Sequence, residues 1–338
     1  MLSIIHKSAF WKIMLNAVTL FGLIFAIGLS VAYGATDISL STVWQAVLAF
    51  NPELTSHQVI RELRIPRALS AAMVGGFLAV SGAIMQGMTR NPLASPSVMG
   101  VTHGASFALV IMLAFFPAAS NLGLIFASFV GAGIAVTLVF MVGSFSSGGL
   151  TPVKLALAGV AIGTMLSSLS SVIALHFQLE KQLGFWLAGG LAGANWMSVQ
   201  LLLISGVVGM FIALVIARSI TVLNLGDEVA TGLGQNNLII KVFGIITVLI
   251  LTGAAVSVAG VVGFIGLIIP HMARFIIGTN YSWIIPTSAV FGALLLVLAD
   301  VVSRLVNAPF ETPVGAITSL IGVPFFLYLA RGSSGGAK

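Results

Sequence analysis

Cysteine is absent from the 338-residue chain, and charged residues make up only 7% of it, against 59% hydrophobic residues. Without cysteine the protein can form neither disulfide bonds nor thiolate metal sites, although this leaves its redox compartment open. Roughly a quarter of the residues of soluble domains are charged, so a chain this poor in charge is an integral membrane protein. The 14 Lys and Arg residues form no basic run beyond the opening stretch. Basic loops beside lipid therefore explain the net charge better than a nucleic-acid partner does.

Sequence motifs for chemistry are missing as well. The phosphate-binding sequence G-x-x-x-x-G-K-S/T occurs nowhere, so any ATP that drives this protein has to be hydrolysed by another chain. The histidines are scattered, and we expect no metal site. Because no nucleophile, acid pair or ligand cluster stands out in the apolar segments, we expect neither an enzyme nor a cofactor bound to this chain.

Ten apolar segments can be drawn as membrane-spanning helices, since about 20 apolar residues cross the hydrocarbon core of a bilayer. The first is preferred as an uncleaved helix over a cleavable signal peptide, because its apolar run is long enough to span. The eighth is expected to be a short or broken helix, because it contains Pro270 together with His271 and Arg274. The predicted spans are residues 13–32, 66–88, 98–116, 122–145, 155–175, 199–217, 242–258, 260–277, 284–299 and 314–329.

No long linker or low-complexity tract divides the chain, so residues 1–338 are predicted to form a single transmembrane domain. The glycine-rich segment 184–196 is too short to span and is interpreted as a surface or re-entrant piece. The tail 332–338 is expected to be disordered. The predicted fold class is an all-α polytopic membrane protein of about ten transmembrane helices.

The distribution of charge gives the predicted orientation. With the N-terminus in the cytoplasm, ten spans leave nine Lys and Arg residues on the cytoplasmic side and five outside, whereas two acids lie inside and six outside. An excess of Lys and Arg in cytoplasmic loops is the usual arrangement in membrane proteins. Both termini are therefore predicted to be cytoplasmic.

Four arginines fall on the outer side, against that rule. Arg61, Arg64 and Arg67 lie at the entrance of the second span in "RELRIPRALS", and Arg304 follows the ninth in "ADVVSRL". Pro66 is predicted to be the first residue of the second helix. This would place Arg67 in the first turn, near the positive end of the helix dipole.

Two explanations of these arginines stay open. They can snorkel to lipid headgroups or pair with neighbouring acids. Alternatively, they form a docking surface for an acidic partner outside the membrane. The local pairs considered are Arg61 or Arg64 with Glu62, and Arg304 with Asp300 or Glu311.

The longest polar cytoplasmic insertion is segment 222–237, "VLNLGDEVATGLGQNN", between spans six and seven. Asp227 and Glu228 suit the start of a helix and Gly234 its end. A helix as short as "DEVATGL" is unstable alone, so another part of the protein has to support it. The loop "SSGGLTPVK" joins spans four and five on the same side.

Long motifs follow one another along nearly the whole chain. They are "LRIPRALSAAMVGGFLAVSGAIMQGMTRNPLASPSVMGV", "TPVKLALAGVAIG", "LNLGDEVATGLG", "AGVVGFIGLIIPHMAR", "ADVVSRL" and "ETPVGAITSLIGVPFFLYL". Together they resemble the permease subunits of the bacterial ABC importers for iron siderophores, haem and vitamin B12. The resemblance implies the type II ABC importer permease fold, in a dimer of ten-helix permeases with two cytoplasmic ATPase subunits and an external substrate-binding protein. ATP and Mg²⁺ would then bind to the ATPase partner.

The resemblance also implies roles for particular residues. In the vitamin B12 importer, arginines that match the outer motifs face glutamates of the binding protein, and a loop that matches segment 222–237 contacts the ATPase. The implied docking residues are Arg64, Arg67 and Arg304, together with Arg61, which lies outside the motif. The implied ATPase contacts are Gly226, Asp227, Glu228, Ala230, Leu233 and Gly234. The inner gate is implied at Thr151, Pro152 and Val153.

The predicted function is that of an ABC importer permease for a ferric siderophore in the bacterial cell membrane, with haem or a corrinoid as alternative cargo. An ion-coupled secondary transporter is the competing class, but such proteins carry ionisable residues within their spans. All eight acids of this chain fall in loops or at span ends, which favours the importer. The expected partners are membrane lipid, a second permease that is either identical or similar, the ATPase and the binding protein, and not nucleic acid.

Overall fold

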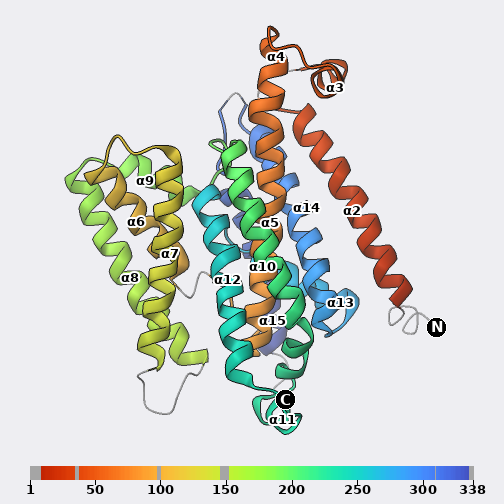
Figure 1. Ribbon diagram of the computed structural model, residues 1–338, viewed down its shortest axis with the longest axis vertical. Helices are drawn as coiled ribbons and strands as arrows, with labels where there is room; N and C mark the ends of the chain where they lie inside the picture. Colours follow the sequence, from red (N-terminus) through yellow and green to blue (C-terminus); the bar gives the residue numbers. More distant parts are fainter. Residues whose placement is uncertain (1–8, 35–37, 97–99, 145–151, 309, 335–338) are drawn as a thin grey trace.

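The computed structural model describes residues 9–34, 38–96, 100–144, 152–308 and 310–334, and every regular element within these ranges is helical (Figure 1). The all-α class predicted from the sequence is therefore confirmed. The elements are α2 (Ala9–Ala32), α3 (Leu40–Leu48), α4 (Thr55–Gln58), the π-helical segment η1 (Val59–Arg64), α5 (Ile65–Thr89), α6 (Val101–Phe115), α7 (Asn121–Ser144), α8 (Pro152–His176), α9 (Glu180–Ala188), α10 (Trp196–Leu223), α11 (Asp227–Gly232), α12 (Asn237–Ala259), α13 (Ile265–Ile277), α14 (Tyr281–Leu305) and α15 (Val314–Ser334).

Seven helices of the described ranges are long and apolar enough to cross a membrane. They are α2, the continuous run of α4, η1 and α5, and helices α7, α8, α10, α12 and α14. Three shorter apolar helices are α6, α13 and α15. Each of the ten predicted spans coincides with one of these helices, while the crossing of the membrane by all ten stays a prediction.

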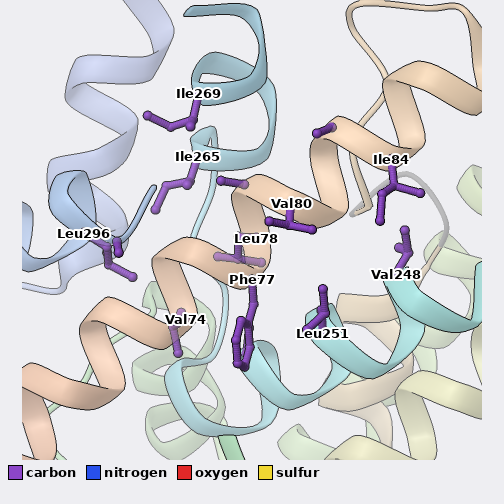
Figure 2. Packing of buried hydrophobic residues seen from close by; sticks show 14 of the residues in the cluster. Val74, Phe77, Leu78, Val80, Ile84, Val248, Leu251, Ile265, Ile269 and Leu296 are labelled. Atoms are coloured by element: carbon purple, nitrogen blue, oxygen red, sulfur yellow. The ribbon is translucent and has the colours of Figure 1, made fainter. Parts of the chain in front are cut away.

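Helix α5 lies at the centre of the bundle and packs against α10, α12, α13 and α14. Its most apolar window is 83% buried, which is expected of a helix that is apolar on all sides. Figure 2 shows Phe77 and Ile84 of α5 beside Leu251 and Val248 of α12, and all four belong to one core cluster. Because α5 runs through the centre, the charged residues that flank it, Arg64 before and Arg90 after, lie at the two ends of the bundle.

Helices α6, α7, α8 and α9 form a second group beside this core (Figure 1). Helix α6 packs against α7 and α8, and α7 joins the group to the core through α12. Helix α8 is loosely covered, since 28% of its apolar window is buried within the chain. The bundle therefore has two parts that meet along α7 and α12.

Glycines allow α5 to approach its neighbours closely. A Cβ atom at Gly75 would collide with the backbone of Gly292 on α14, and one at Gly82 would collide with the backbone of Gly266 on α13. Small residues that let backbones touch are the usual means by which membrane helices associate. The glycine pattern that the sequence shows in α5 is thus explained by packing.

Helix α5 begins at Ile65 with Pro66 in its first turn, as predicted, but the sequence did not predict the helical segment that precedes it, so Arg67 does not lie at the N-terminus of the helical run. The chain is helical from Thr55, and η1 carries it into α5 with a hydrogen bond from the Ile65 N–H to a carbonyl five residues back. In this register the missing N–H of Pro66 leaves the carbonyl of Arg61 without a donor. Trp196 at the start of α10 supplies it, because its Nε1 donates to that carbonyl at 3.1 Å.

Pro270 inside α13 is accommodated in a similar way. Proline lacks the N–H that would bond the carbonyl four residues earlier, which belongs to Gly266. Gln86 of α5 is buried, and its Nε2 donates to this carbonyl at 3.1 Å, while its Oε1 accepts from Arg274. The eighth predicted span is thus a short helix, as expected, and it begins at Ile265 instead of residue 260.

Segment 184–196 contains the end of α9 and the loop that leads to α10. The N–H of Gly190 donates to the carbonyl of Ala259 at the end of α12 at 2.9 Å, so the loop rests on the core. Helix α15 continues to Ser334, and the first residues of the predicted disordered tail are therefore helical. The rest of that tail lies outside the described residues.

Candidate functional site

The two ends of the bundle carry its charged residues, and we call them the arginine end, where α5 begins, and the α11 end (Figure 1). At the arginine end, Asp300 of α14 is fully buried and accepts hydrogen bonds from Nε and Nη2 of Arg67 at 2.9–3.2 Å. Nη2 of Arg304 lies 3.1 Å from the same carboxylate. Because buried charges are stable only when they are paired, Asp300 permits two guanidinium groups to lie here.

Two arginines also hold the C-terminus of α2. Nη1 of Arg64 donates to the carbonyls of Val31 and Ala32 at 3.0 and 2.7 Å, and Nη1 of Arg304 donates to that of Tyr33 at 2.9 Å. The last carbonyls of a helix lack donors within it, and a guanidinium supplies several donors and a positive charge at the negative end of the dipole. Helix α2 is otherwise loosely packed, with 17% of its apolar window buried. The arginines therefore anchor it.

Local pairing accounts for Arg67 and Arg304. The predicted pair of Arg304 with Asp300 is confirmed, whereas Glu311 pairs with Arg67, at 2.6 Å, instead of with Arg304. In the single chain, Arg67 and Arg304 therefore pair with neighbouring acids, which is the first of the two explanations considered above.

Arg64 and Arg304 are only 6% and 3% exposed. In this structure they are not part of an accessible surface, because their donors are used by the end of α2. Arg61 is exposed, and its guanidinium carbon lies 4.5 Å from the centre of the Phe50 ring. A docking role for the four arginines stays a prediction, and Arg61 is the one whose side chain is open to a partner.

A recess of about 450 Å³ lies beside the ion cluster at the arginine end. Arg67, Asp300 and Glu311 line one part of it, and Phe185 and Trp186 of α9 line another. Charged and aromatic groups in one recess can bind the polar end of a ligand or a side chain of a partner.

Helix α11 is supported by the bundle, as its shortness predicted. Asp227 forms an ion pair with Lys241 of α12 at 2.9 Å, and Nδ2 of Asn237 donates to the carbonyl of Asp227 at 2.8 Å. Gln235 donates from Nε2 to a carbonyl near the end of α10 at 3.2 Å. Ala230 is fully buried against the core. These contacts fix α11 between α10 and α12.

The free face of α11 differs from the predicted one. Ala230, which the resemblance implied as an ATPase contact, is not accessible, because it packs against the core of its own chain. Leu225, Val229 and Leu233 are instead 67%, 48% and 69% exposed. Val229 lies on α11, and Leu225 and Leu233 flank it in the turns at its two ends, so their apolar character beside a polar helix is the signal that could have identified Leu225 and Val229.

The remaining predicted residues of this loop lie where a partner could reach or where the backbone turns. Glu228 is exposed, and Asp227 is partly exposed beside Lys241. Gly226 and Gly234 bracket α11 with φ values of 132° and 80°, a region that favours glycine. The turns into and out of α11 therefore depend on these two residues.

The predicted gate region falls largely beyond the structural description. Thr151 lies outside the described residues, and Pro152 and Val153 form the beginning of α8. Their role in gating stays a prediction.

A model of the FecCD transport family matches residues 22–332. The chain belongs to the FecCD transport family. Membership in a family of transport proteins agrees with the all-helical fold and with its long apolar helices. The FecCD-family chain is an integral protein of the bacterial cell membrane, and its relatives are permease subunits and not enzymes. The family also implies an ATPase and a substrate-binding protein as partners.

Individual relatives agree with this assignment. The iron(3+)-hydroxamate import system permease protein FhuB of Bacillus subtilis is 60% identical over 303 residues, which cover 90% of this chain and 79% of FhuB. The Fe(3+)-citrate import system permease protein YfmD of the same organism is 44% identical over 320 residues, 95% of each chain. A solved structure of a metal-chelate type ABC transporter in an inward-facing conformation matches with a TM-score of 0.83 at 29% identity, over 94% of this chain and 99% of that one.

Proposed function

We propose that this FecCD-family permease passes a ferric hydroxamate siderophore across the bacterial cell membrane. The observation that supports this cargo is the 60% identity to a hydroxamate permease over 90% of the chain. The identity to a ferric citrate permease is 44%, so ferric citrate is the second cargo to test. Haem and corrinoids are the remaining alternatives.

Uptake of radiolabelled iron tests the cargo. The chain is expressed with its ATPase in a bacterial strain that lacks permeases for ferric chelates, and each chelate is supplied with the binding protein specific for it. Iron is expected to accumulate from the hydroxamate chelate and not from citrate or haem. Accumulation from citrate alone would contradict the hydroxamate assignment and support the second cargo.

We also propose that the exposed row of Leu225, Val229 and Leu233 contacts the ATPase. Three apolar side chains at a polar end of the bundle favour burial against a partner. The bonds that hold α11 to α10 and α12 would transmit a displacement of this row to the core. ATP and Mg²⁺ bind to the ATPase partner in this proposal, and the permease itself holds no cofactor.

Val229→Asp tests this contact, with Val306→Asp as its matched control. Val229 is 48% exposed on α11, and Val306 is 65% exposed at the opposite end of the bundle. A charge placed in an apolar contact has no partner and weakens it strongly. Co-purification of the ATPase is expected to be lost in Val229→Asp and kept in Val306→Asp. Equal recovery of the ATPase with both variants would contradict the proposed contact.

The proposed assembly contains two permeases, two ATPase subunits and one binding protein, and the second permease is either another copy or a similar chain. The family and the metal-chelate transporter fold support this arrangement. Mass determination of the complex after mild solubilisation, with identification of each chain, measures the stoichiometry. A complex with a single permease would contradict it.

Docking of the binding protein at the arginine end is proposed to depend on Arg61. This side chain is exposed, whereas Arg64 and Arg304 support α2, so charge reversal of the latter two would disturb the fold as well. Arg61→Glu is expected to slow association of the binding protein and to weaken its salt dependence, since exposed charges act mainly on encounter. Arg61→Lys keeps the charge and is the control. Wild-type association of Arg61→Glu would contradict the role.

A further inference from the structure

A groove of about 640 Å³ lies where the two parts of the bundle meet. It is lined by residues of α5, α7, α8 and α12, and nearly all of them are apolar. Helix α12 contributes the longest row, from Leu238 through Val242 and Ile246 to Leu249, which extends about 16 Å at a rise of 1.5 Å per residue. Leu238, Val242 and Ile246 are 65%, 45% and 40% exposed. The groove thus leaves an apolar face of a membrane helix without full cover in the chain.

A basic residue lies in the groove at its α11 end. Lys241 lines it directly. Arg90 follows the lining residue Thr89 at the end of α5, and Lys154 precedes Leu155 at the start of α8. Lys241 is therefore the cation that lines this end of the groove, and Asp227, its ion-pair partner, is the acid placed there by that contact.

We propose that this groove binds an anionic phospholipid, with an acyl chain along α12 and the phosphate at Lys241. The apolar row has the length of much of an acyl chain, and basic pockets between membrane helices favour anionic headgroups. The Lys241 ammonium has three N–H donors, and one of them bonds Asp227. The other two can donate to the lipid phosphate.

The site has a consequence for α11. Lys241 is the residue that joins the headgroup position to Asp227, the first residue of α11. A lipid that holds Lys241 in place therefore also stabilises the position of the ATPase-facing row. The proposal about the lipid goes beyond the transport function, and neither requires the other.

Lipid retention by the full-length permease, purified with the partners that accompany it, tests the site. The protein is placed in vesicles of phosphatidylcholine, with or without phosphatidylglycerol, extracted mildly, and examined by native mass spectrometry. Phosphatidylglycerol is expected to be retained in preference to phosphatidylcholine, and inorganic phosphate added in excess is expected not to displace it, because the acyl chain supplies much of the binding.

Two variants separate the apolar and the charged parts of the site. Ile246→Trp fills the groove and is expected to lose the retained phosphatidylglycerol, whereas Ile204→Trp, at a 66% exposed position of α10 outside the groove, is expected to keep it. Lys241→Gln is expected to reduce the preference for phosphatidylglycerol about fivefold, the factor for one lysine beside an anionic headgroup.

Three results would overturn the proposal. They are wild-type retention in Ile246→Trp, equal retention of both lipids by the unmodified protein, and displacement by inorganic phosphate, which would mark a phosphate site without an acyl chain. Lipid retention is measured without transport. Loss of the lipid result would therefore not contradict the proposed permease function, and a negative iron-uptake result would not contradict the lipid site.

Discussion

Asp300 is the buried acid on which two guanidinium groups at the arginine end depend. Asp300→Ala removes a carboxylate that accepts three hydrogen bonds from Arg67 and lies 3.1 Å from Nη2 of Arg304. Removal of one partner of a buried ion pair costs roughly 3–5 kcal/mol. Arg67 keeps Glu311 and Arg304 keeps the carbonyls at the end of α2. We therefore expect the free energy of unfolding to fall by ~3 kcal/mol, the lower end of that range.

Glu311→Ala is the matched control, because it removes the other carboxylate that Arg67 contacts. The Glu311 side chain is 39% exposed, whereas that of Asp300 is fully buried. Exposed ion pairs contribute about 0–1 kcal/mol, so this variant is expected to remain close to wild type. Denaturant unfolding of the detergent-solubilised proteins, followed by tryptophan fluorescence, measures both changes.

Two results would refute the stabilising role of the buried Asp300 carboxylate. If Asp300→Ala loses less than about 1 kcal/mol, the value for an exposed pair, then the buried ion cluster does not stabilise the arginine end. Equal losses in the two variants would also refute the reasoning, because burial would then make no difference to the two carboxylates.

Three further predictions concern packing, the proline sites and topology. Gly82→Ala adds a methyl group that meets the backbone of α13 and is expected to cost ~1–3 kcal/mol of unfolding free energy, whereas Gly22→Ala, which enters open space on α2, is expected to be neutral. Trp196→Phe removes the donor to the carbonyl freed by the proline at the start of α5 and is expected to cost ~1 kcal/mol in the same assay. In intact cells, a single cysteine introduced at Thr231 is expected to resist an impermeant thiol reagent, and one introduced at Asn51 is expected to react with it. The reason is that the distribution of Lys and Arg predicts a cytoplasmic α11 end. Labelling at Thr231 but not at Asn51 would show that the predicted orientation is wrong.

The helices could be located from the sequence because the transfer of apolar residues into a bilayer is a local property of each segment. Hydropathy therefore identified the ten apolar helices of the described residues, and Pro270 with His271 and Arg274 indicated that the eighth is short or broken. Proline correctly indicated the start of α5, but the sequence did not predict that α4 and η1 continue into it through Pro66. The carbonyl that this proline frees is satisfied by Trp196, a residue 135 positions away in sequence, and no local rule includes such a partner.

The α11 region shows the same division. The sequence located the short helix, with Asp227 and Glu228 at its start and Gly234 at its end, because capping and backbone conformation depend on neighbouring residues. Which of its faces is free depended on how α11 lies against α10 and α12. Packing buried Ala230 and exposed Val229, although the two are adjacent in sequence.

By itself, the sequence determined the membrane class, the helical segments, the predicted orientation and the motifs that mark the family, because composition and local pattern carry this information. Only the tertiary structure decided what the arginines do. Arg64 meets carbonyls more than 30 positions away, and Arg67 meets Asp300 at a separation of 233. A guanidinium can bond a lipid headgroup, a partner or a buried carboxylate with similar chemistry, and which of these it bonds is settled by the folding of α2, α5 and α14 against one another.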